Sequence, residues 1–408
     1  MTECSFVRPG AGGYKNHMAR QFRILQLNSA RKYIGEAAHT LNLTEALRRR
    51  GHTVWLGLRA GYDTFTQAGA RHLEPIGFHM PHRWWPPQDL PDVRHIARLV
   101  RENKIDVIHA HRGKDHWQAV LASRLHRLGV PVIRTRHVVT PLANHAVNRW
   151  LARRTAALVA VSRAVADDVR RSGVYEEARV AFIPGGVDLA LFAPASAEKK
   201  AAARERLLAS LAATGGEAVA WPLVACVARF AVVKAHRVLL AAWKQVAAAL
   251  PSARLLLIGD GQLMQESRAL ARAAGVEHSV FFLGRRSDVP ELLDAVDVGC
   301  LSSVGSEGFS RAVLEYMAKG LPVVATRVGA VPDLIEDGVH GVLAAPALDS
   351  ALAASLLRVL RASPEERAQW GRAGRAKAER EYGYDTWAAA HEELYLQVLG
   401  SSGDRVTA

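Results

Sequence analysis

Few cysteines and no long apolar run occur in this sequence, and both absences narrow the class of protein. The 408 residues include three cysteines, Cys4, Cys226 and Cys300. They are too few for a disulfide framework and too scattered for a zinc site, so we expect a reducing, cytoplasmic compartment. The longest uncharged stretch near the middle, residues 218–228, is far shorter than the roughly 20 apolar residues of a membrane span. No charged-then-apolar signal segment opens the chain. We therefore expect a soluble protein.

The length and the charge distribution indicate how the chain is organised. A chain of 408 residues exceeds what one hydrophobic core organises, so two domains are expected. Residues 1–190 hold 29 basic and 15 acidic residues, a net charge of +14, whereas residues 191–408 hold 24 of each. The basic half suggests an anionic partner, such as a phospholipid surface or a phosphorylated glycan, or else a solvated basic surface. Nucleic acid is disfavoured, because the tight basic run Arg48–Arg50 has no accompanying aromatic platform.

Strand-like and helix-like segments alternate along most of the chain. Residues 22–27 read as a buried strand, a leucine-containing helix ends at residues 50–52, and residues 53–56 read as the next strand. This pattern recurs to residue 183 and begins again at residue 223, which predicts two doubly wound parallel sheets. The expected parts are a flexible leader 1–19 with Met18 as an alternative start, an N-terminal domain 20–190, a linker 191–217, a C-terminal domain 218–385 and a helix 386–400.

Two glutamates eight positions apart flank a glycine loop in the second half. Glu307 precedes Gly308, and Glu315 lies inside a helix that is predicted to begin near Ser310. The backbone N–H groups of Phe309 and Ser310 would offer a positive helix end to a diphosphate. Carboxylates beside such a site suit the hydroxyl groups of a ribose and a sugar. A capping glutamate followed by an exposed helix face is the simpler structural alternative.

Several further segments occur in the same order as in a known family. They are Arg50–Val54, Val161-Ser162, Ile183–Asp188, Leu257–Gly261, Phe282–Pro290, Lys319–Thr326 and Gly329–Asp333. With the Glu-x7-Glu motif, they make the chain from about Ile24 to Val398 resemble the retaining GT-B glycosyltransferases of family 4 (group 1), including the bacterial envelope and lipopolysaccharide type. The resemblance implies an α/β fold with two Rossmann-like, doubly wound parallel-sheet domains facing a cleft, and a last helix that crosses back to the N-terminal domain.

The resemblance also implies donor-site roles in the second domain. Arg229 and Lys234 match the basic pair on the donor pyrophosphate, and such cations can neutralise a leaving diphosphate without a metal. No Asp-x-Asp occurs in the sequence, so no metal or other cofactor is expected. Glu315 matches the ribose ligand and Glu307 the residue that contacts the donor sugar. Ala235 stands where the family usually has glycine. The donor-binding set is completed by Gly35 of the first domain's glycine turn and by Gly308, Phe309, Ser310 and Arg311.

In the first domain the resemblance points to a histidine at a strand end. His111 matches the family's cleft histidine and is expected to be catalytic, whereas His109 points to the opposite face of the strand and is expected to be structural. An ordinary strand-end histidine is the alternative for His111. The acceptor-side candidates are His39, Arg112, Lys114, Arg136 and His137.

These observations predict a retaining, metal-independent transferase that moves a sugar from a UDP-, GDP- or ADP-linked donor to a glycan or lipid-linked acceptor. The expected setting is envelope polysaccharide or lipopolysaccharide synthesis in the cytoplasm or at the cytoplasmic face of the inner membrane, with the basic domain toward anionic lipid. Two alternatives remain: a sugar-nucleotide epimerase or hydrolase on the same scaffold, and a non-enzymatic module that binds anionic lipid or glycan. A dehydrogenase is disfavoured, since no Gly-x-Gly-x-x-Gly follows a predicted strand.

Overall fold

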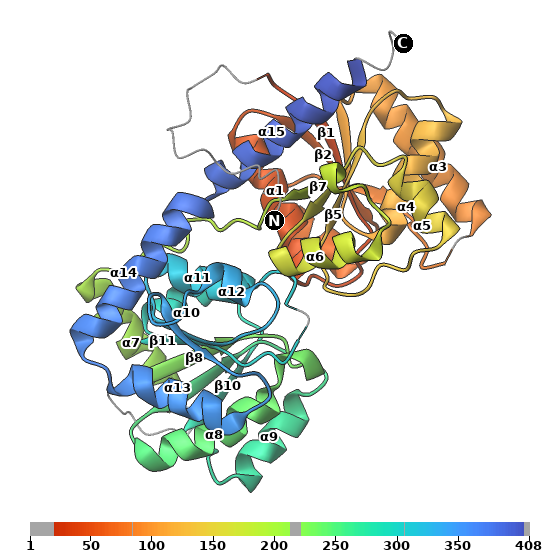
Figure 1. The fold of residues 1–408 in the computed structure, drawn as a ribbon. Coiled ribbons are helices and arrows are strands. Elements are labelled where there is room, and N and C mark those ends of the chain that lie inside the picture. Colours follow the sequence, from red (N-terminus) through yellow and green to blue (C-terminus); the bar gives the residue numbers. More distant parts are fainter. Residues whose placement is uncertain (1–19, 84, 213–221, 306, 404–408) are drawn as a thin grey trace. The chain divides into compact units, whose positions relative to one another are not determined.

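The computed structural model describes residues 20–83, 85–212, 222–305 and 307–403, and these residues form two compact units (Figure 1). Unit 1 comprises the chain up to Gly186 together with the segment from Tyr384 onward, and unit 2 comprises Val187–Gly383. The expected leader 1–19, including Met18, lies outside the described residues. Within the described ranges, no helix has both the length and the apolar character needed to cross a membrane.

Unit 1 is built on a seven-stranded parallel sheet with the order β3-β2-β1-β4-β5-β6-β7. Its strands are β1 (Arg23–Asn28), β2 (Thr53–Arg59), β3 (Ile76–Phe78), β4 (Val107–Ala110), β5 (Val132–Arg136), β6 (Ala157–Ala160) and β7 (Val180–Phe182). Its helices are α1 (Gly35–Arg49), α2 (Asp63–Ala70), α3 (Pro86–Glu102), α4 (Gly113–Leu125), α5 (Ala146–Ala152), α6 (Arg163–Ser172), the 3-10 turn η1 (Glu177–Arg179) and α15 (Tyr384–Gly403).

Unit 2 repeats this plan with six parallel strands in the order β10-β9-β8-β11-β12-β13. Its strands are β8 (Leu223–Val227), β9 (Arg254–Ile258), β10 (Val280–Gly284), β11 (Val298–Leu301), β12 (Val323–Thr326) and β13 (Gly341–Ala344). Its helices are α7 (Ala197–Ala212), η2 (Val232–Lys234), α8 (His236–Ala249), α9 (Met264–Ala273), α10 (Val289–Asp294), α11 (Arg311–Ala318), α12 (Val331–Leu334), α13 (Asp349–Arg361) and α14 (Pro364–Glu381).

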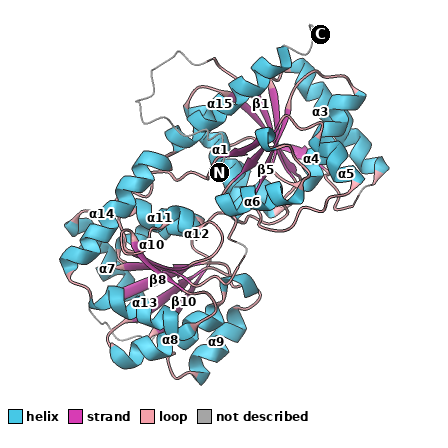
Figure 2. Cartoon of the chain, viewed as in Figure 1, coloured by secondary structure: helices cyan, strands magenta, loops and turns pink. Residues whose placement is uncertain are grey.

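Each sheet is covered by helices on both faces, which explains why its strands are apolar without alternation (Figure 2). In β1, Ile24 packs in a core with α1 and α15, and the next residue, Leu25, packs in a core with α3 and α4. In β8, Val224 and Ala225 enter two different cores in the same way. The expected pair of doubly wound parallel sheets is confirmed.

The last helix, α15, belongs to the core of unit 1. Trp387 and Tyr395 are buried among residues of β1 and α1. The Glu392 carboxylate accepts hydrogen bonds from Arg50 Nε at 2.5 Å and Arg50 Nη2 at 2.8 Å, and lies 2.7 Å from His52 Nε2. These partners hold the pKa of Glu392 at about 2 against the opposing effect of burial. Residues more than 330 positions apart therefore complete one folded unit.

Helix α7 lies in the segment expected to be a linker. Its Leu207 and Leu211 are buried in a core of unit 2, and Arg204 donates a hydrogen bond to the Asp297 carboxylate at 3.1 Å. This part of the segment is therefore folded onto unit 2, because its apolar face packs in the core that also holds residues of α10.

Candidate functional site

Both sheets reverse their strand order at one point, and the candidate residues follow the strands that flank it. In unit 1 the reversal lies between β1 and β4, and in unit 2 it lies between β8 and β11. Ligands of such folds bind at the carboxyl ends of the strands beside this switch point. His111 directly follows β4, Lys234 comes after β8, and Glu307 comes after β11. The topology thus places each candidate at the edge where ligands bind.

In unit 2, Glu307 is held by a lysine and a serine. Lys234 Nζ forms an ion pair with Glu307 Oε1, and Ser303 Oγ donates a hydrogen bond to the same oxygen. The Glu307 residue is 3% exposed, whereas the Lys234 side chain is 24% exposed. Ser302 Oγ donates to the main-chain carbonyl of Lys234 at 2.8 Å, which ties η2 to the end of β11. The site therefore holds a buried negative charge on Glu307 and, beside it, a positive charge on Lys234 that solvent can reach.

The backbone of Glu307 is fixed by the turn at Gly329. Ala330 N donates to the Glu307 carbonyl at 2.8 Å. Gly329 has φ +51°, and a Cβ at this position would lie 2.1 Å from the Glu307 carbonyl oxygen. Only glycine permits this approach. The turn at Gly329 and Ala330 therefore holds the main chain of the Glu307 loop in place.

Glu315 lies one turn inside α11 and pairs with a neighbouring arginine. Its Oε1 is 3.0 Å from Arg311 Nε, and the residue is 7% exposed. Burial raises the pKa of Glu315, and the Arg311 guanidinium opposes this effect. The simpler alternative of an exposed helix face does not hold for Glu315, because its side chain is buried.

The amino end of α11 carries an unsatisfied buried hydroxyl. Ser310 is the N-cap residue and 2% exposed, and its Oγ has no hydrogen-bond partner among the described residues. Gly308 is buried and Phe309 half-buried in the loop before it. The first-turn amides of a helix have no intrahelical acceptor, so they favour an anion.

The loop after β8 presents Arg229 to solvent while its main chain is tightly held. Gly259 has φ +143°, and a Cβ there would lie 2.2 Å from the Ala228 carbonyl oxygen. Gly261 has φ +149°, and a Cβ there would lie 2.4 Å from the Phe230 carbonyl oxygen. Ala235, which follows Lys234, adopts the left-handed conformation with φ +47°. The conformation that the usual glycine would favour is thus present here with alanine.

In unit 1, His111 is the centre of a histidine cluster. Its Nε2 lies 3.1 Å from Gln26 Oε1, which is a hydrogen bond in the tautomer that carries the proton on Nε2. Its Nδ1 lies 3.3 Å from His137 Nε2. The expectation that His109 points to the opposite face is wrong, because residues two apart in a strand share a face: its ring stacks on that of His111, with centroids 4.6 Å apart. The His109 nitrogens lie 2.8 Å from Tyr395 Oη and 2.7 Å from Thr135 Oγ1.

His39 joins this cluster from α1. Its ring centroid lies 4.6 Å from that of His137 and 4.7 Å from that of the Trp387 ring, and its buried Nε2 has no hydrogen-bond partner among the described residues. The ligand nitrogens of His39, His111 and His137 all lie within 4.8 Å of one another. A search of the histidine, cysteine, aspartate and glutamate side chains of the described residues finds these three histidines close enough together to hold a metal ion.

All three imidazoles are uncharged near neutral pH. Burial lowers the pKa of His39 and of His111 well below the usual range, with neighbouring histidines acting in the same direction. Burial lowers the pKa of His137 to about 3, helped by Arg112 and Arg134. A neutral imidazole donates from one nitrogen and accepts at the other, which suits hydrogen bonds to sugar hydroxyls.

The cationic candidates of unit 1 are paired with carboxylates of the same unit. Arg112 forms an ion pair with Glu36, Lys114 Nζ lies 2.6 Å from Asp89, and Arg136 Nη2 lies 3.5 Å from Asp168. Gly35, the first residue of α1, is exposed, and a Cβ there would meet nothing within 4 Å. No neighbour in the described residues demands glycine at this position.

Sequence reasoning missed the residues that orient the predicted ones. Gln26 contacts His111, Ser303 contacts Glu307, and Trp387 contacts His39. Asp115 accepts hydrogen bonds from the main-chain N–H groups of His111 and Arg112. A glutamine inside the apolar run of β1 was the available signal for Gln26. The contact between Trp387 and His39 has no local signal, since it depends on the return of α15.

Comparisons with known proteins identify a glycosyltransferase of the GT-B fold that uses a nucleotide sugar. Residues 35–191 match the family model described as Glycosyltransferase Family 4, and residues 221–362 match that of Glycosyl transferases group 1. The chain belongs to this family of glycosyltransferases.

Individual relatives agree with this assignment. The D-inositol 3-phosphate glycosyltransferase of Xylanimonas cellulosilytica is 29% identical over 89% of this chain and 91% of its own length. The GDP-mannose-dependent monoacylated alpha-(1-6)-phosphatidylinositol monomannoside mannosyltransferase of Corynebacterium glutamicum is 33% identical, over 50% of this chain and 52% of its own length. The crystal structure of Anabaena HepE in complex with UDP shares the fold, with a TM-score of 0.77 and 23% identity over 92% of this chain and all of HepE.

Proposed function

We propose that the chain is a retaining, metal-independent glycosyltransferase that moves a sugar from a nucleoside-diphosphate sugar to a glycan or lipid-linked acceptor. The observation that carries this proposal is the arrangement in unit 2 of Lys234, Glu307 and Glu315 around the amino end of α11. The proposed roles follow from charge and hydrogen-bonding capacity. His111, Arg229, Lys234 and Glu307 form the proposed catalytic set.

Lys234 and Arg229 would neutralise the departing diphosphate. Lys234 is held by Glu307, and Arg229 is exposed on the loop that Gly259 and Gly261 approach closely, so both cations are available after β8. Preorganised cations that meet developing negative charge can perform the role of a metal ion. The amides at the start of α11 and the unpaired hydroxyl of Ser310 add hydrogen-bond donors for the same group.

Glu307 and Glu315 would bind hydroxyl groups of the donor. The Lys234 and Ser303 contacts leave Glu307 Oε2 able to accept from a sugar hydroxyl, and Glu315 would accept from the ribose. Retention would follow a front-side route. In this route the bond from the anomeric carbon to the diphosphate oxygen breaks, the acceptor oxygen attacks from the same face, and a donor phosphate oxygen takes the acceptor proton.

The His39, His111 and His137 cluster would serve the acceptor or the transferred sugar. Three neutral imidazoles at one strand edge can hydrogen-bond hydroxyl groups without attracting a second diphosphate. Two relatives act, by their names, on inositol 3-phosphate or on a phosphatidylinositol mannoside, and this supports a lipid-linked or phosphorylated acceptor here. We place the reaction in envelope polysaccharide or lipopolysaccharide synthesis, at the cytoplasmic face of the inner membrane.

The test is a thermal-shift panel of UDP-, GDP-, ADP- and dTDP-sugars followed by transfer assays on membrane glycolipids. One donor should raise the melting temperature of the wild-type chain and have no effect on Lys234→Ala. The product of that donor should keep the anomeric configuration by NMR. A product of inverted configuration would exclude the front-side route, and release of free sugar without any acceptor product would favour the hydrolase alternative.

A further inference from the structure

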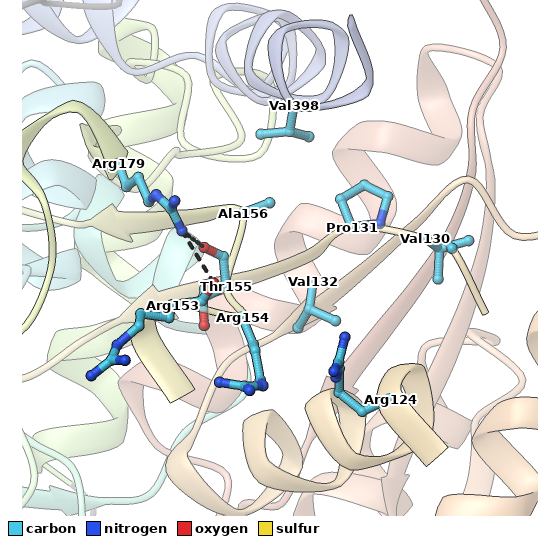
Figure 3. A pocket seen from close by; sticks show the side chains of 11 residues that line it. Arg124, Val130, Pro131, Val132, Arg153, Arg154, Thr155, Ala156, Arg179 and Val398 are labelled. Atoms are coloured by element: carbon cyan, nitrogen blue, oxygen red, sulfur yellow. Dashed lines mark hydrogen bonds between the residues drawn. The ribbon is translucent and has the colours of Figure 1, made fainter. Parts of the chain in front are cut away.

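A second cationic site lies in unit 1, on the edge of the sheet opposite the histidine cluster. Its pocket has a volume of about 270 Å³ and is lined by Pro131 and Val132 at the amino end of β5 and by Thr155 and Ala156 before β6 (Figure 3). His137, by contrast, follows the carboxyl end of β5. The pocket is therefore separate from the residues proposed for sugar transfer.

Four arginines surround this pocket, and the fold fixes two of them. Arg154 Nη1 donates to the Trp150 carbonyl at 3.1 Å, and its guanidinium lies 4.4 Å from the centroid of the Trp150 ring. Arg179 Nη1 donates to the carbonyls of Arg153 and Thr155, each at 3.4 Å (Figure 3). Guanidinium groups held in this way lose little conformational entropy when a ligand binds.

The other two arginines extend from the ends of helices. Arg124 lies in the last turn of α4, and Arg153 is the C-cap residue of α5. Within the described part of the chain, neither side chain makes a hydrogen bond or ion pair, and both residues are exposed. The carboxyl end of a helix attracts a cation, which explains an arginine at each of these two positions. It does not explain why Arg154 and Arg179 line the same pocket.

Among the residues that the structure describes, no carboxylate lines the pocket to balance these charges. The lining contains arginine, glycine, proline, threonine and aliphatic residues, and the exposed Glu176 pairs with Arg179 from outside the lining, at 3.2 Å. The Nε of Arg154 is buried and has no acceptor among the described residues. Four arginines in one lining give the pocket an excess of positive charge that an anion would balance, and the forked donors of guanidinium groups match phosphate oxygens.

We infer that this arginine pocket binds a phosphate group, as a phosphomonoester or a diphosphate. The volume falls below the roughly 300–1,000 Å³ of pockets for drug-sized ligands, so it fits a small anion and not a whole nucleotide sugar. Val398 of α15 also lines the pocket, so an occupied site would contact the helix that closes unit 1. The inference does not depend on the proposed transfer reaction, because it uses none of the same residues.

The test compares two double variants that remove the same charge. Arg124→Gln/Arg153→Gln changes the pocket at two exposed side chains, and Arg94→Gln/Arg98→Gln changes two exposed arginines of α3. Titration with inorganic pyrophosphate at constant ionic strength should give a dissociation constant at least about tenfold weaker in the pocket variant than in the control. Pyrophosphate that binds in unit 2 would contribute equally to both, so only the difference reports on the pocket. Equal affinities would overturn the inference.

Vesicle sedimentation distinguishes the two sources of the phosphate group. Binding to phosphatidylglycerol vesicles but not to phosphatidylcholine vesicles, lost in Arg124→Gln/Arg153→Gln and competed by pyrophosphate, would identify a lipid headgroup. Pyrophosphate binding that depends on the pocket without vesicle binding would identify a soluble phosphorylated ligand. Vesicle binding that is unchanged in the pocket variant, together with no difference in pyrophosphate affinity, would overturn the inference.

Discussion

The two units share a parallel, doubly wound sheet, yet the polar groups at their switch points differ in charge. Unit 1 gathers His39, His111 and His137, whose pKa values are lowered by burial, and unit 2 gathers charged pairs around Glu307 and Glu315. Under the proposed function, this edge of the sheet binds neutral hydroxyl groups in unit 1 and a diphosphate in unit 2. The net charge of each half does not predict this difference, since the basic half holds the uncharged cluster.

Lys234 gives the strongest test of the difference between the two units. Lys234→Ala removes the cation on Glu307 and should lower kcat/KM for transfer by about 100-fold or more, because a preorganised group that meets developing charge contributes this much. Steady-state kinetics with the donor from the panel measures the change. Lys244→Ala, at an exposed lysine of α8, is the control and should keep its activity. Near-normal activity of Lys234→Ala would show that the donor site has been misassigned.

His111→Ala tests the other unit. The loss of one hydrogen bond to a sugar or acceptor should reduce transfer by about 10-fold to 100-fold. Nucleotide affinity should stay unchanged, because His111 belongs to unit 1 and the proposed nucleotide ligands Lys234 and Glu315 belong to unit 2. Calorimetric titration with the nucleoside diphosphate separates the two effects. Loss of nucleotide affinity in His111→Ala as well would contradict the assignment of the nucleotide to unit 2 alone.

Gly329→Ala addresses the support of the Glu307 loop. The added Cβ would lie 2.1 Å from the Glu307 carbonyl oxygen at a positive φ, so we expect a loss of about 1–3 kcal/mol in the free energy of unfolding and reduced transfer. Gly338→Ala also has a positive φ but open space around the new Cβ, so it isolates the cost of the backbone conformation. Equal stability and activity of the two variants would show that the close approach is unimportant.

The lowered pKa values of the histidine cluster should make unit 1 sensitive to acid. The folded-state pKa of His137 is about 3, below the unfolded value of about 6.5, so the unfolded chain binds more protons between these values. Stability is therefore complete above about pH 6.5 and falls as the pH is lowered toward 3, by up to about 1.4 kcal/mol per pH unit for each such histidine. Denaturant titrations from pH 7.5 to 5 measure this slope. His137→Gln should flatten this slope, and an unchanged slope would show that folding does not lower the pKa of His137.

The smallest expected effect is that of a chelator. EDTA or 1,10-phenanthroline should leave turnover unchanged, because Lys234 and Arg229 are proposed to neutralise the diphosphate. A loss of activity that Zn²⁺ restores in the wild-type chain but not in His39→Ala would place a metal on the histidine cluster and contradict the metal-independent route.

The residues that sequence patterns predicted well are those next to strand ends. Apolar runs and turns predicted both sheets, and the Glu-x7-Glu spacing placed Glu307 in a loop and Glu315 in α11, as the structure has them. The pairs that span long separations could not be predicted, because Arg50 meets Glu392 only after α15 returns to unit 1. The burial of His39 is of the same kind, since Trp387 covers it from that helix. The left-handed conformation of Ala235 has no signal in the residue itself, because alanine does not favour it; the glycine that is usual at this position in the family was the only indication.

We propose that the nucleotide binds in unit 2, and one binding measurement tests this assignment directly. Calorimetric titration of UDP, GDP and ADP into the wild-type chain, Lys234→Ala and His111→Ala should show binding of one nucleotide that is lost in Lys234→Ala and retained in His111→Ala. Binding that survives in Lys234→Ala and is lost in His111→Ala would contradict the account and move the nucleotide to the histidine cluster of unit 1.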